Sequence, residues 1–393
     1  MDADAAARTE ARVRELLEER LAVGAFSGAA VAMAVDGETA VEFQLGVKAS
    51  VDENGERIPG DAAEPVTRDA MFDLASVTKV VSAHTILTLV ADGLLELDRP
   101  IAETLPSYRE GAKRAVTLRH LLTHTSGLPG SWHGWEQPLL KHLEARPAPA
   151  PRLAATPLTD RQALLAELLA TELAAAPGEH FRYSCAGYNT AMALAETVTG
   201  TAWHELVTGR TLEPLGVATE LAFGAPAPAS VATEFDVRFD RGLLRGAVHD
   251  ETAWVLAGHS ANAGLFGTAA GTLALAEALR TRTDDVVLGD WMWHGQLGRM
   301  LGEGRNHDTP SGYDHSLGLR VGQLNMMGES GAAARGHTGF TGTSLQTDRD
   351  RGISIVLLTN RVHPSRHGPG IEGLRAEVAD AVYEGFGRAA PAV

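Results

Sequence analysis

Ser76 and Lys79 stand three positions apart in the segment Phe72–His84, and together these residue types could perform acyl transfer. If a helix starts near Leu74, positions i and i+3 share one face, so the Lys79 amine comes within reach of the Ser76 hydroxyl. A serine hydroxyl alone is a poor nucleophile, and a neighbouring amine that can be uncharged is one way to activate it. Because an S-x-x-K also arises by chance in a chain of this size, the spacing alone leaves a purely structural role open.

The composition of the chain singles out Lys79. Only four lysines stand against thirty arginines. Arginine keeps its proton at accessible pH, whereas burial lowers the pKa of a lysine and lets its amine act as a base. We therefore expect Lys79 to be buried, to have a lowered pKa and to serve Ser76 as a base or proton relay.

Charge and hydropathy exclude several function classes. A formal net charge of −16 argues against a nucleic-acid or anionic membrane surface, because both need basic patches. The chain contains neither a secretion signal nor a run of eighteen apolar residues, so we expect no membrane partner and a cytoplasmic location. Its single cysteine, Cys185, excludes an internal disulfide and a cysteine-based zinc site.

Strand patterns occur near both ends of the chain. Residues 29–35 and 39–47 are β-rich and flank Asp36-Gly37, the strongest short hairpin signal. Near the other end, the β-like stretches are residues 316–324, 342–346 and 353–360. Amphipathic helices are expected at the two ends of this arrangement, over residues 9–23 and 371–386.

The middle of the chain is mainly helical, and this order predicts an α+β fold. We expect one unit over residues 1–393, in which residues 1–73 and 305–393 form an antiparallel sheet flanked by helices. Residues 74–304 then form an all-helical lobe. A cleft between two such lobes is a common place for a site.

Three further patterns could carry function. The Ala- and Pro-rich flap at residues 131–159 begins with Trp132 and Trp135, which are candidate pocket walls, although plain packing explains them equally well. His120 and His124 have the i, i+4 spacing of a helical metal pair, but no third ligand is signalled, so we expect no metal. Residues 328–332 imitate a nucleophile elbow but lack its last glycine and a following helix.

Three motifs in one order give the chain a family resemblance. Residues 76–79 read Ser-Val-Thr-Lys, residues 183–185 read Tyr-Ser-Cys, and residues 337–339 read His-Thr-Gly. The ordered set resembles the serine β-lactamase and penicillin-binding-protein superfamily, and the resemblance covers roughly residues 27–386. Within it, the similarity is to the branch with class C β-lactamases, D-alanyl-D-alanine peptidases and related esterases, and it implies the β-lactamase-like fold.

The resemblance implies a role for each motif. Ser76 is the nucleophile that becomes acylated, Lys79 its base or proton relay, and Tyr183 the group that hands a proton to the leaving group. Which of Lys79 and Tyr183 is the acylation base stays open. The backbone N–H groups of Ser76 and Phe340 form the oxyanion hole. No cofactor is implied.

The same resemblance implies that His337, Thr338, Gly339 and Cys185 contact the substrate, and two of these depart from the family pattern. Cys185 stands where the family has an asparagine that contacts the substrate amide, and a thiol cannot replace an amide as donor and acceptor. His337 stands where many members have a lysine, and it offers a substrate carboxylate only a partly protonated ring. Both departures favour esters over β-lactams.

The leading hypothesis is a serine hydrolase working through an acyl-enzyme on a small ester or amide, most simply a carboxylesterase. A cytoplasmic peptidase or muramyl-peptide amidase, or a weak β-lactamase, remains an alternative with the same chemistry. A catalytically silent acyl-binding or sensor protein is the alternative of another class. The sequence does not indicate the oligomeric state or the natural substrate.

Overall fold

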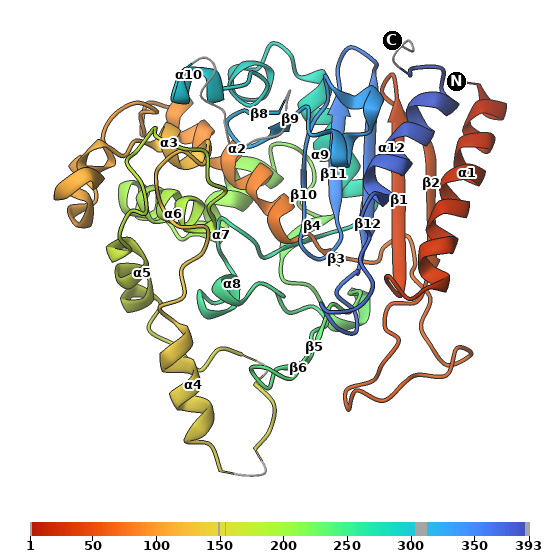
Figure 1. Cartoon of the computed structure of the whole chain (residues 1–393), viewed down its shortest axis with the longest axis horizontal. Coiled ribbons are helices and arrows are strands. Elements are labelled where there is room, and N and C mark those ends of the chain that lie inside the picture. Colours follow the sequence, from red (N-terminus) through yellow and green to blue (C-terminus); the bar gives the residue numbers. More distant parts are fainter. Residues whose placement is uncertain (1, 148–149, 154, 303–312, 390–393) are drawn as a thin grey trace.

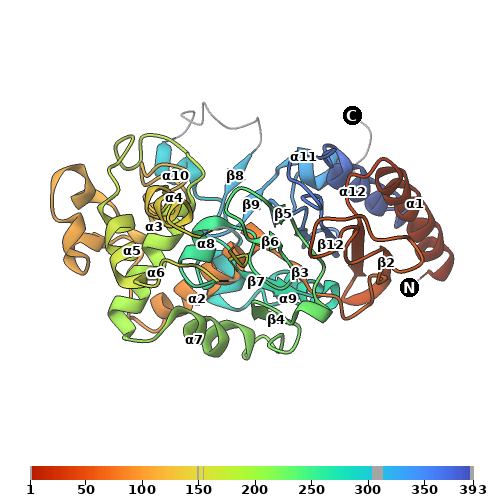
Figure 2. The same ribbon diagram turned by 90° about the horizontal axis from the view of Figure 1, so that it is seen from below.

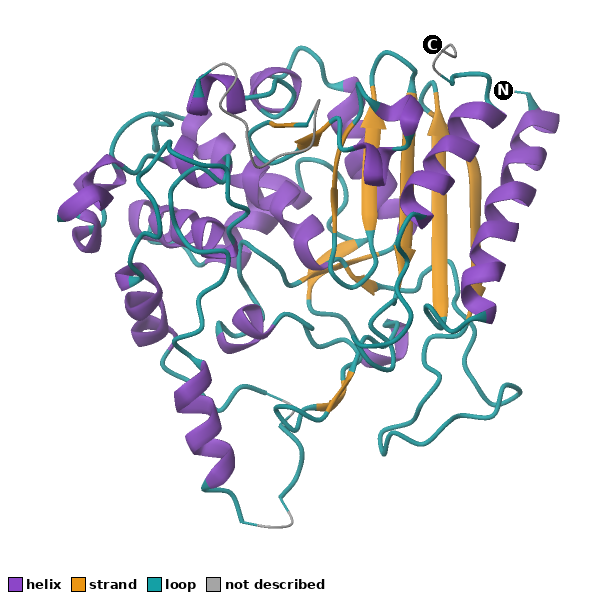
Figure 3. Ribbon diagram, in the orientation of Figure 1, coloured by secondary structure: helices purple, strands orange, loops and turns teal. Residues whose placement is uncertain are grey.

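A seven-stranded antiparallel sheet forms one side of the molecule in a computed structural model, which describes residues 2–147, 150–153, 155–302 and 313–389 (Figures 1 and 3). Its strand order is β2-β1-β12-β11-β10-β9-β8. The strands are β1 (Gly28–Val35), β2 (Glu38–Gly46), β8 (Asp314–His315), β9 (Arg320–Val321), β10 (Arg335–Thr338), β11 (Ser344–Asp348) and β12 (Ile353–Thr359).

The two ends of the chain meet in this sheet, as the order of the predicted elements required. Strand β1 pairs with β12 along its length, from Ala29 opposite Thr359 to Val35 opposite Ile353. The hairpin between β1 and β2 turns at Asp36 and Gly37, whose φ angles of 51° and 93° suit the mirror-image turn that this dipeptide favours. Both termini consequently lie at the same end of the molecule (Figure 1). The predicted α+β class is confirmed.

Alternation along β1 separates two hydrophobic cores. Ala29, Val31 and Met33 face α1 (Ala3–Ala22) and α12 (Leu374–Gly385), which pack against each other on one side of the sheet. The intervening alanines face the main core, where α9 (Ala269–Thr281) packs on β1, β11 and β12. Figure 2 shows α1 and α12 on one side of these strands and α9 on the other. Small side chains on that face of β1 let α9 approach the sheet closely.

The middle of the chain is mainly helical, but it is not all-helical as expected, because short strands also lie in it. A three-stranded sheet joins it to the nucleophile segment, in the order β3 (Phe72–Asp73), β7 (Leu265–Gly267) and β4 (Leu221–Phe223), and β5 (Phe235–Asp236) pairs with β6 (Gly242–Leu243). The remaining helices are α2 (Thr78–Ala91), α3 (Leu118–Leu122), α4 (Glu136–Glu144), α5 (Arg161–Ala170), α6 (Cys185–Thr199), α7 (Trp203–Val207), α8 (Glu251–Val255), α10 (Leu297–Leu301) and α11 (Leu324–Met327).

Helix α2 runs through the middle of the molecule. Eleven of its fourteen residues are buried, because α6 and α7 cover it from the helical side. A helix that is apolar on all sides must be enclosed on all sides. Its first turn is therefore a rigid place from which to present Lys79, directly after the segment that carries Ser76.

Two expectations about the chain differ from what the structure shows or stay open. The strand expected over residues 316–324 is wrong, because Gly318 and Gly322 have φ angles of 112° and 63° and break it into the two-residue β9 and the start of α11. The division at residues 73 and 305 stays a prediction, and α9 from the middle segment packs on the sheet of the outer segments. Among the described residues no helix has the length and hydropathy to cross a membrane.

Candidate active site

The candidate nucleophile Ser76 lies in a short 3-10 helix, η1 (Ala75–Val77), directly before α2. The preceding Ala75 has φ 46°, in the left-handed region that costs a residue with a Cβ about 1 kcal/mol or more. The buried Asp73 holds this turn: its carboxylate accepts hydrogen bonds from the backbone N–H groups of Ala75 at 2.8 Å and of His249 at 2.7 Å. Burial raises the pKa of Asp73. The sequence therefore positions Ser76 by a strained, internally bonded turn.

Lys79 contacts Ser76 as the spacing predicted. Its side chain is fully buried in the first turn of α2. The ammonium donates to Ser76 Oγ at 3.1 Å, to the carbonyl oxygen of Asn262 at 2.9 Å and to Cys185 Sγ at 3.4 Å. An ammonium has three N–H donors, so these three acceptors satisfy it completely.

The lowered pKa expected for Lys79 is wrong. Burial acts in the expected direction, against the charged form, but the Cys185 thiol and the Tyr183 phenol, when ionised, outweigh burial and raise the pKa of Lys79 above its ordinary value. The sequence around Lys79 does not show this effect, because Cys185 and Tyr183 come from a distant segment of the chain. Lys79 is built as a cation in this arrangement rather than as a neutral amine.

Tyr183 faces Lys79 from the segment before α6. The Lys79 Nζ atom lies 4.9 Å from the centre of the Tyr183 ring. The Tyr183 hydroxyl is buried and has no hydrogen-bond partner among the described residues, so it is available to a substrate. Ser184, which caps α6, donates to the carbonyl oxygen of Pro129 at 2.6 Å and so fastens this segment to the preceding loop. The structure thus brings together Ser76, Lys79 and Tyr183.

The turn between β10 and β11 closes the site from the sheet side. Thr338, Gly339 and Phe340 line the cavity beside Ser76. A Cβ at Gly339 would lie 2.5 Å from the Leu74 carbonyl oxygen and 2.1 Å from Thr343 Oγ1, so only glycine fits. This close approach brings the backbone of Phe340 to the nucleophile turn.

His337 lies elsewhere than expected. Its ring is fully buried, it is 6.0 Å from the Tyr183 ring between centres, and it is absent from the cavity lining. Nδ1–H donates to the carbonyl oxygen of Thr338 at 2.8 Å. Burial, together with the nearby charges of Arg320 and Lys79, holds the pKa of His337 well below its ordinary value. His337 is therefore a neutral ring behind Tyr183 and not a partly protonated contact for a carboxylate.

The two tryptophans of the flap are also absent from the cavity lining. Trp132 and Trp135 are 5% and 3% exposed and belong to the main core. The Trp135 indole N–H donates to the Trp132 carbonyl oxygen at 3.1 Å, and the Trp135 ring meets Phe239 edge-on. Packing, the alternative left open by the sequence, describes them, because large aromatic rings after a Gly-Ser turn gain most from burial.

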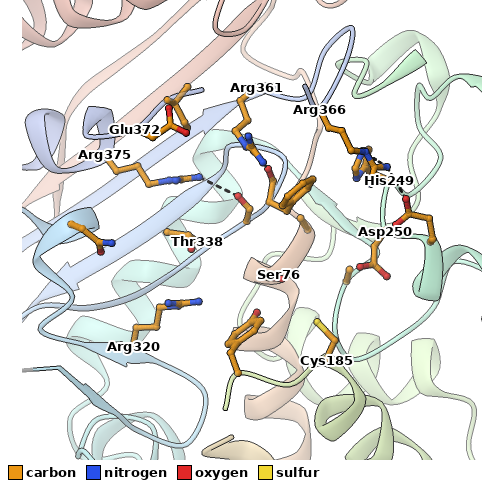
Figure 4. A pocket seen from close by; sticks show the side chains of 18 of the residues that line it. Ser76, Cys185, His249, Asp250, Arg320, Thr338, Arg361, Arg366, Glu372 and Arg375 are labelled. Atoms are coloured by element: carbon orange, nitrogen blue, oxygen red, sulfur yellow. Dashed lines mark hydrogen bonds and ion pairs between the residues drawn. The ribbon is translucent and has the colours of Figure 1, made fainter. Parts of the chain in front are cut away.

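A cavity of about 810 Å³ contains the reactive groups (Figure 4). Ser76, Tyr183 and Cys185 lie in its wall, and further lining side chains that the sequence reasoning did not single out are charged or titratable: His249, Asp250, Glu251, Arg320, Arg361, Arg366, Glu372 and Arg375. Sequence reasoning missed Asn262 as well. Its contact with Lys79 uses a backbone carbonyl, which leaves no signal in residue type. Among the described residues no cluster of three or more His, Cys, Asp or Glu side chains could hold a metal ion.

Comparison with known proteins agrees with this geometry. A sequence model described as Beta-lactamase matches residues 13–380. The chain is 30% identical over 353 residues to Esterase EstB of Burkholderia gladioli, covering 82% of this chain and 84% of that protein. It is 28% identical over 325 residues to a putative D-alanyl-D-alanine carboxypeptidase of Escherichia coli K12, covering 76% of this chain and 70% of that protein.

Solved structures share the fold at lower identity. EstCE1, a hydrolase with promiscuous acyltransferase activity, superposes with a TM-score of 0.70 at 22% identity, covering 96% of this chain and 99% of that one. A class C β-lactamase superposes with a TM-score of 0.68 at 17% identity and 96% coverage of both chains. Since the family match spans nearly the whole chain and includes the segments that carry Ser76, Lys79 and Tyr183, the chain belongs to the β-lactamase family of serine hydrolases and penicillin-binding proteins.

Proposed function

We propose that this protein is a carboxylesterase that hydrolyses small esters through an acyl-enzyme on Ser76. The observation that carries the proposal is the contact between Lys79 Nζ and Ser76 Oγ at 3.1 Å, together with the position of Ser76 and Tyr183 in the wall of one cavity. The similarity to Esterase EstB supports an ester rather than a lactam. So does Cys185, which offers no amide to a lactam substrate.

The chemistry follows from the positions of the groups. Ser76 Oγ attacks the ester carbonyl while Tyr183, acting as the base, accepts its proton, and Lys79 remains the cation that stabilises both oxygens. The carbonyl oxygen becomes an oxyanion that accepts from the backbone N–H groups of Ser76 and Phe340. Tyr183 returns the proton to the departing alcohol. Water then repeats the sequence on the acyl-enzyme and releases the acid.

Thr338, Gly339 and Cys185 are proposed to contact the substrate, because all three lie in the cavity wall. The raised pKa of Lys79 supports Tyr183 as the acylation base, since a protonated amine cannot accept the Ser76 proton. We keep two further predictions as part of this proposal. The outer segments and the middle segment act as two lobes of one unit, and the protein works in the cytoplasm.

A second candidate function is a peptidase or muramyl-peptide amidase, which the similarity to the putative D-alanyl-D-alanine carboxypeptidase favours. Weak β-lactamase activity is a third outcome of the same acyl-enzyme chemistry. The fold would also serve a silent acyl-binding protein, but intact Ser76 and Tyr183 in one cavity wall, with Lys79 hydrogen-bonded to Ser76, argue against it.

A substrate panel tests the proposal. We expect 4-nitrophenyl butyrate to be hydrolysed with a kcat/KM at least about tenfold above that for a chromogenic cephalosporin or a D-alanyl-D-alanine peptide. Ser82→Ala is the matched control for Ser76→Ala, because Ser82 lies on α2 outside the cavity lining and its hydroxyl has no partner among the described residues. A preference for the peptide or the cephalosporin would replace the esterase assignment.

A further inference from the structure

Three arginines line the cavity without a carboxylate partner. Arg320 comes from β9, Arg361 from the loop after β12 and Arg375 from α12, and we name this set the arginine wall. A fourth lining arginine, Arg366, differs because it pairs with Glu234 and Glu251 at 2.7 Å. No ion pair joins the arginine wall to an acidic side chain anywhere in the described parts of the chain.

Neutral acceptors hold each member of the wall. Arg320 donates to the Gln323 side-chain oxygen at 2.9 Å, and Arg361 donates to the Phe340 carbonyl oxygen at 2.7 Å. Arg375 donates to the carbonyl oxygen of Gly339 at 3.1 Å. These contacts use few of the five N–H donors of each guanidinium. The Nε atoms of Arg320 and Arg375 are buried and have no partner in the part of the chain that the structure describes.

Arg361 and Arg320 both act on Arg375. Burial, followed by Arg361 and Arg320, lowers the pKa of Arg375 to about 10. Burial also lowers the pKa of Arg361. Glu372 is the acidic side chain that opposes both shifts, but it is exposed and forms no ion pair with either arginine. Unpaired cations that are partly removed from water are costly, and an anion placed among these half-buried arginines recovers part of that cost.

The positive charge of the arginine wall is opposite in sign to the net charge of the chain. The chain carries a net charge of −16, yet this side of the cavity is cationic. Asp250 lies on the opposite side of the cavity from Arg320 and Arg375 (Figure 4). Because the overall charge repels anions, an anion reaches Ser76 only if the cavity itself offers local positive charge.

We infer that the arginine wall binds an anionic group of the carboxylate class on the substrate of the Ser76 site. A guanidinium presents paired N–H donors that match the two oxygens of a carboxylate. The inference rests on the proposed esterase function and narrows it to esters that carry a carboxylate. His337 cannot bind this carboxylate, since its neutral ring is buried outside the cavity lining. The arginines are therefore the groups that bind it.

Two pairs of esters test the inference and locate the carboxylate. The monoester of glutaric acid with 4-nitrophenol carries it on the acyl side, with 4-nitrophenyl valerate as neutral control. The substrate 4-acetoxybenzoate carries it on the leaving group, with its methyl ester as neutral control. We expect one charged member to exceed its control at least about tenfold in kcat/KM, and this ratio to fall as salt is added.

Variants connect the preference to named side chains. Arg320→Gln and Arg361→Gln should each lower the charged-to-neutral ratio about tenfold, through KM more than kcat, and Arg320→Lys should restore part of it. Arg68→Gln is the matched control, because Arg68 pairs with Glu42 on the surface far from the cavity lining. Equal rates for charged and neutral esters, or an unchanged ratio in both glutamine variants, would overturn the arginine wall.

The test separates failure of the wall from failure of the esterase proposal. Hydrolysis of the neutral esters alone supports the esterase function and contradicts the wall. If no ester is hydrolysed, calorimetry on Ser76→Ala with the glutarate monoester still decides. Binding that weakens about tenfold when Arg320→Gln is added supports the wall, and binding that is absent or unchanged contradicts it.

Discussion

Thr343 donates its hydroxyl hydrogen bond to the carbonyl oxygen of Leu74 at 3.0 Å, across 269 residues of sequence. Thr341 makes the same kind of bond to the carbonyl oxygen of Asp73 at 2.7 Å. These two bonds fasten the turn that carries Phe340 to the turn that carries Ser76. The two backbone N–H groups assigned to the oxyanion hole thus belong to one rigid assembly, although they come from opposite ends of the chain.

This relationship predicts a kinetic effect of Thr343→Val. The variant removes the bond to Leu74 while keeping the shape of the side chain, so the distance between the two N–H groups is no longer held. We expect kcat for 4-nitrophenyl butyrate to fall about tenfold or more with little change in KM, because an oxyanion hole acts on the transition state. Thr347 lies further along β11, and Thr347→Val removes its hydrogen bond to Ser354 on β12. This variant should lower the free energy of unfolding by about 1 kcal/mol without the fall in kcat. Equal kcat values for the two variants would contradict the account.

The lowered pKa of Glu234 leads to a prediction of how the stability of the fold depends on pH. Although burial opposes it, hydrogen bonds from His249 and Arg366 lower the pKa of Glu234 to about 2. A depressed folded-state pKa contributes stability above the unfolded-state value of 4.5, and that contribution is lost as the pH falls toward 2. Glu234→Gln should therefore cost on the order of 2–3 kcal/mol at pH 7 and much less near pH 2, measured by urea unfolding. A cost independent of pH would show that the charge of Glu234 is not what stabilises the fold.

The position of Cys185 leads to a prediction about the preference for esters over cephalosporins. Its thiol lies in the cavity wall, 3.4 Å from Lys79 Nζ. Cys185→Asn supplies an amide donor and acceptor, each contributing about 0.5–1.5 kcal/mol, and should raise the ratio of cephalosporin to ester turnover several-fold. The wild-type enzyme should lose activity on treatment with a thiol-alkylating reagent, and the variant should resist it. An unchanged ratio with an unreactive thiol would place Cys185 outside the substrate site.

Local patterns in the sequence predicted the parts of this structure that depend on neighbouring residues. The Asp36-Gly37 hairpin and the contact between Ser76 and Lys79 were predicted correctly, because a turn and one helical face are set by positions a few residues apart. The pKa of Lys79 was not, since the groups that raise it, Cys185 and Tyr183, lie more than a hundred positions away along the chain.

The same limit applies to the cavity wall. Arg320, Arg361 and Arg375 are three among thirty arginines, and only the packing of β9, the loop after β12 and α12 brings them together. For Trp132 and Trp135 the residue type suggested a pocket wall, but both side chains lie in the main hydrophobic core. Residue type indicates what a side chain can do, whereas its partners depend on long-range contacts.

The most direct test of the central claim is covalent labelling with a fluorophosphonate, followed by mass spectrometry of the intact protein and of its peptides. The account predicts one label per chain on the peptide that contains Ser76. It also predicts full labelling of Ser82→Ala and none of Ser76→Ala, with both variants folded by circular dichroism. A label on another residue, or ester hydrolysis that persists in Ser76→Ala within a few-fold of wild type, would contradict the assignment of Ser76 as the nucleophile.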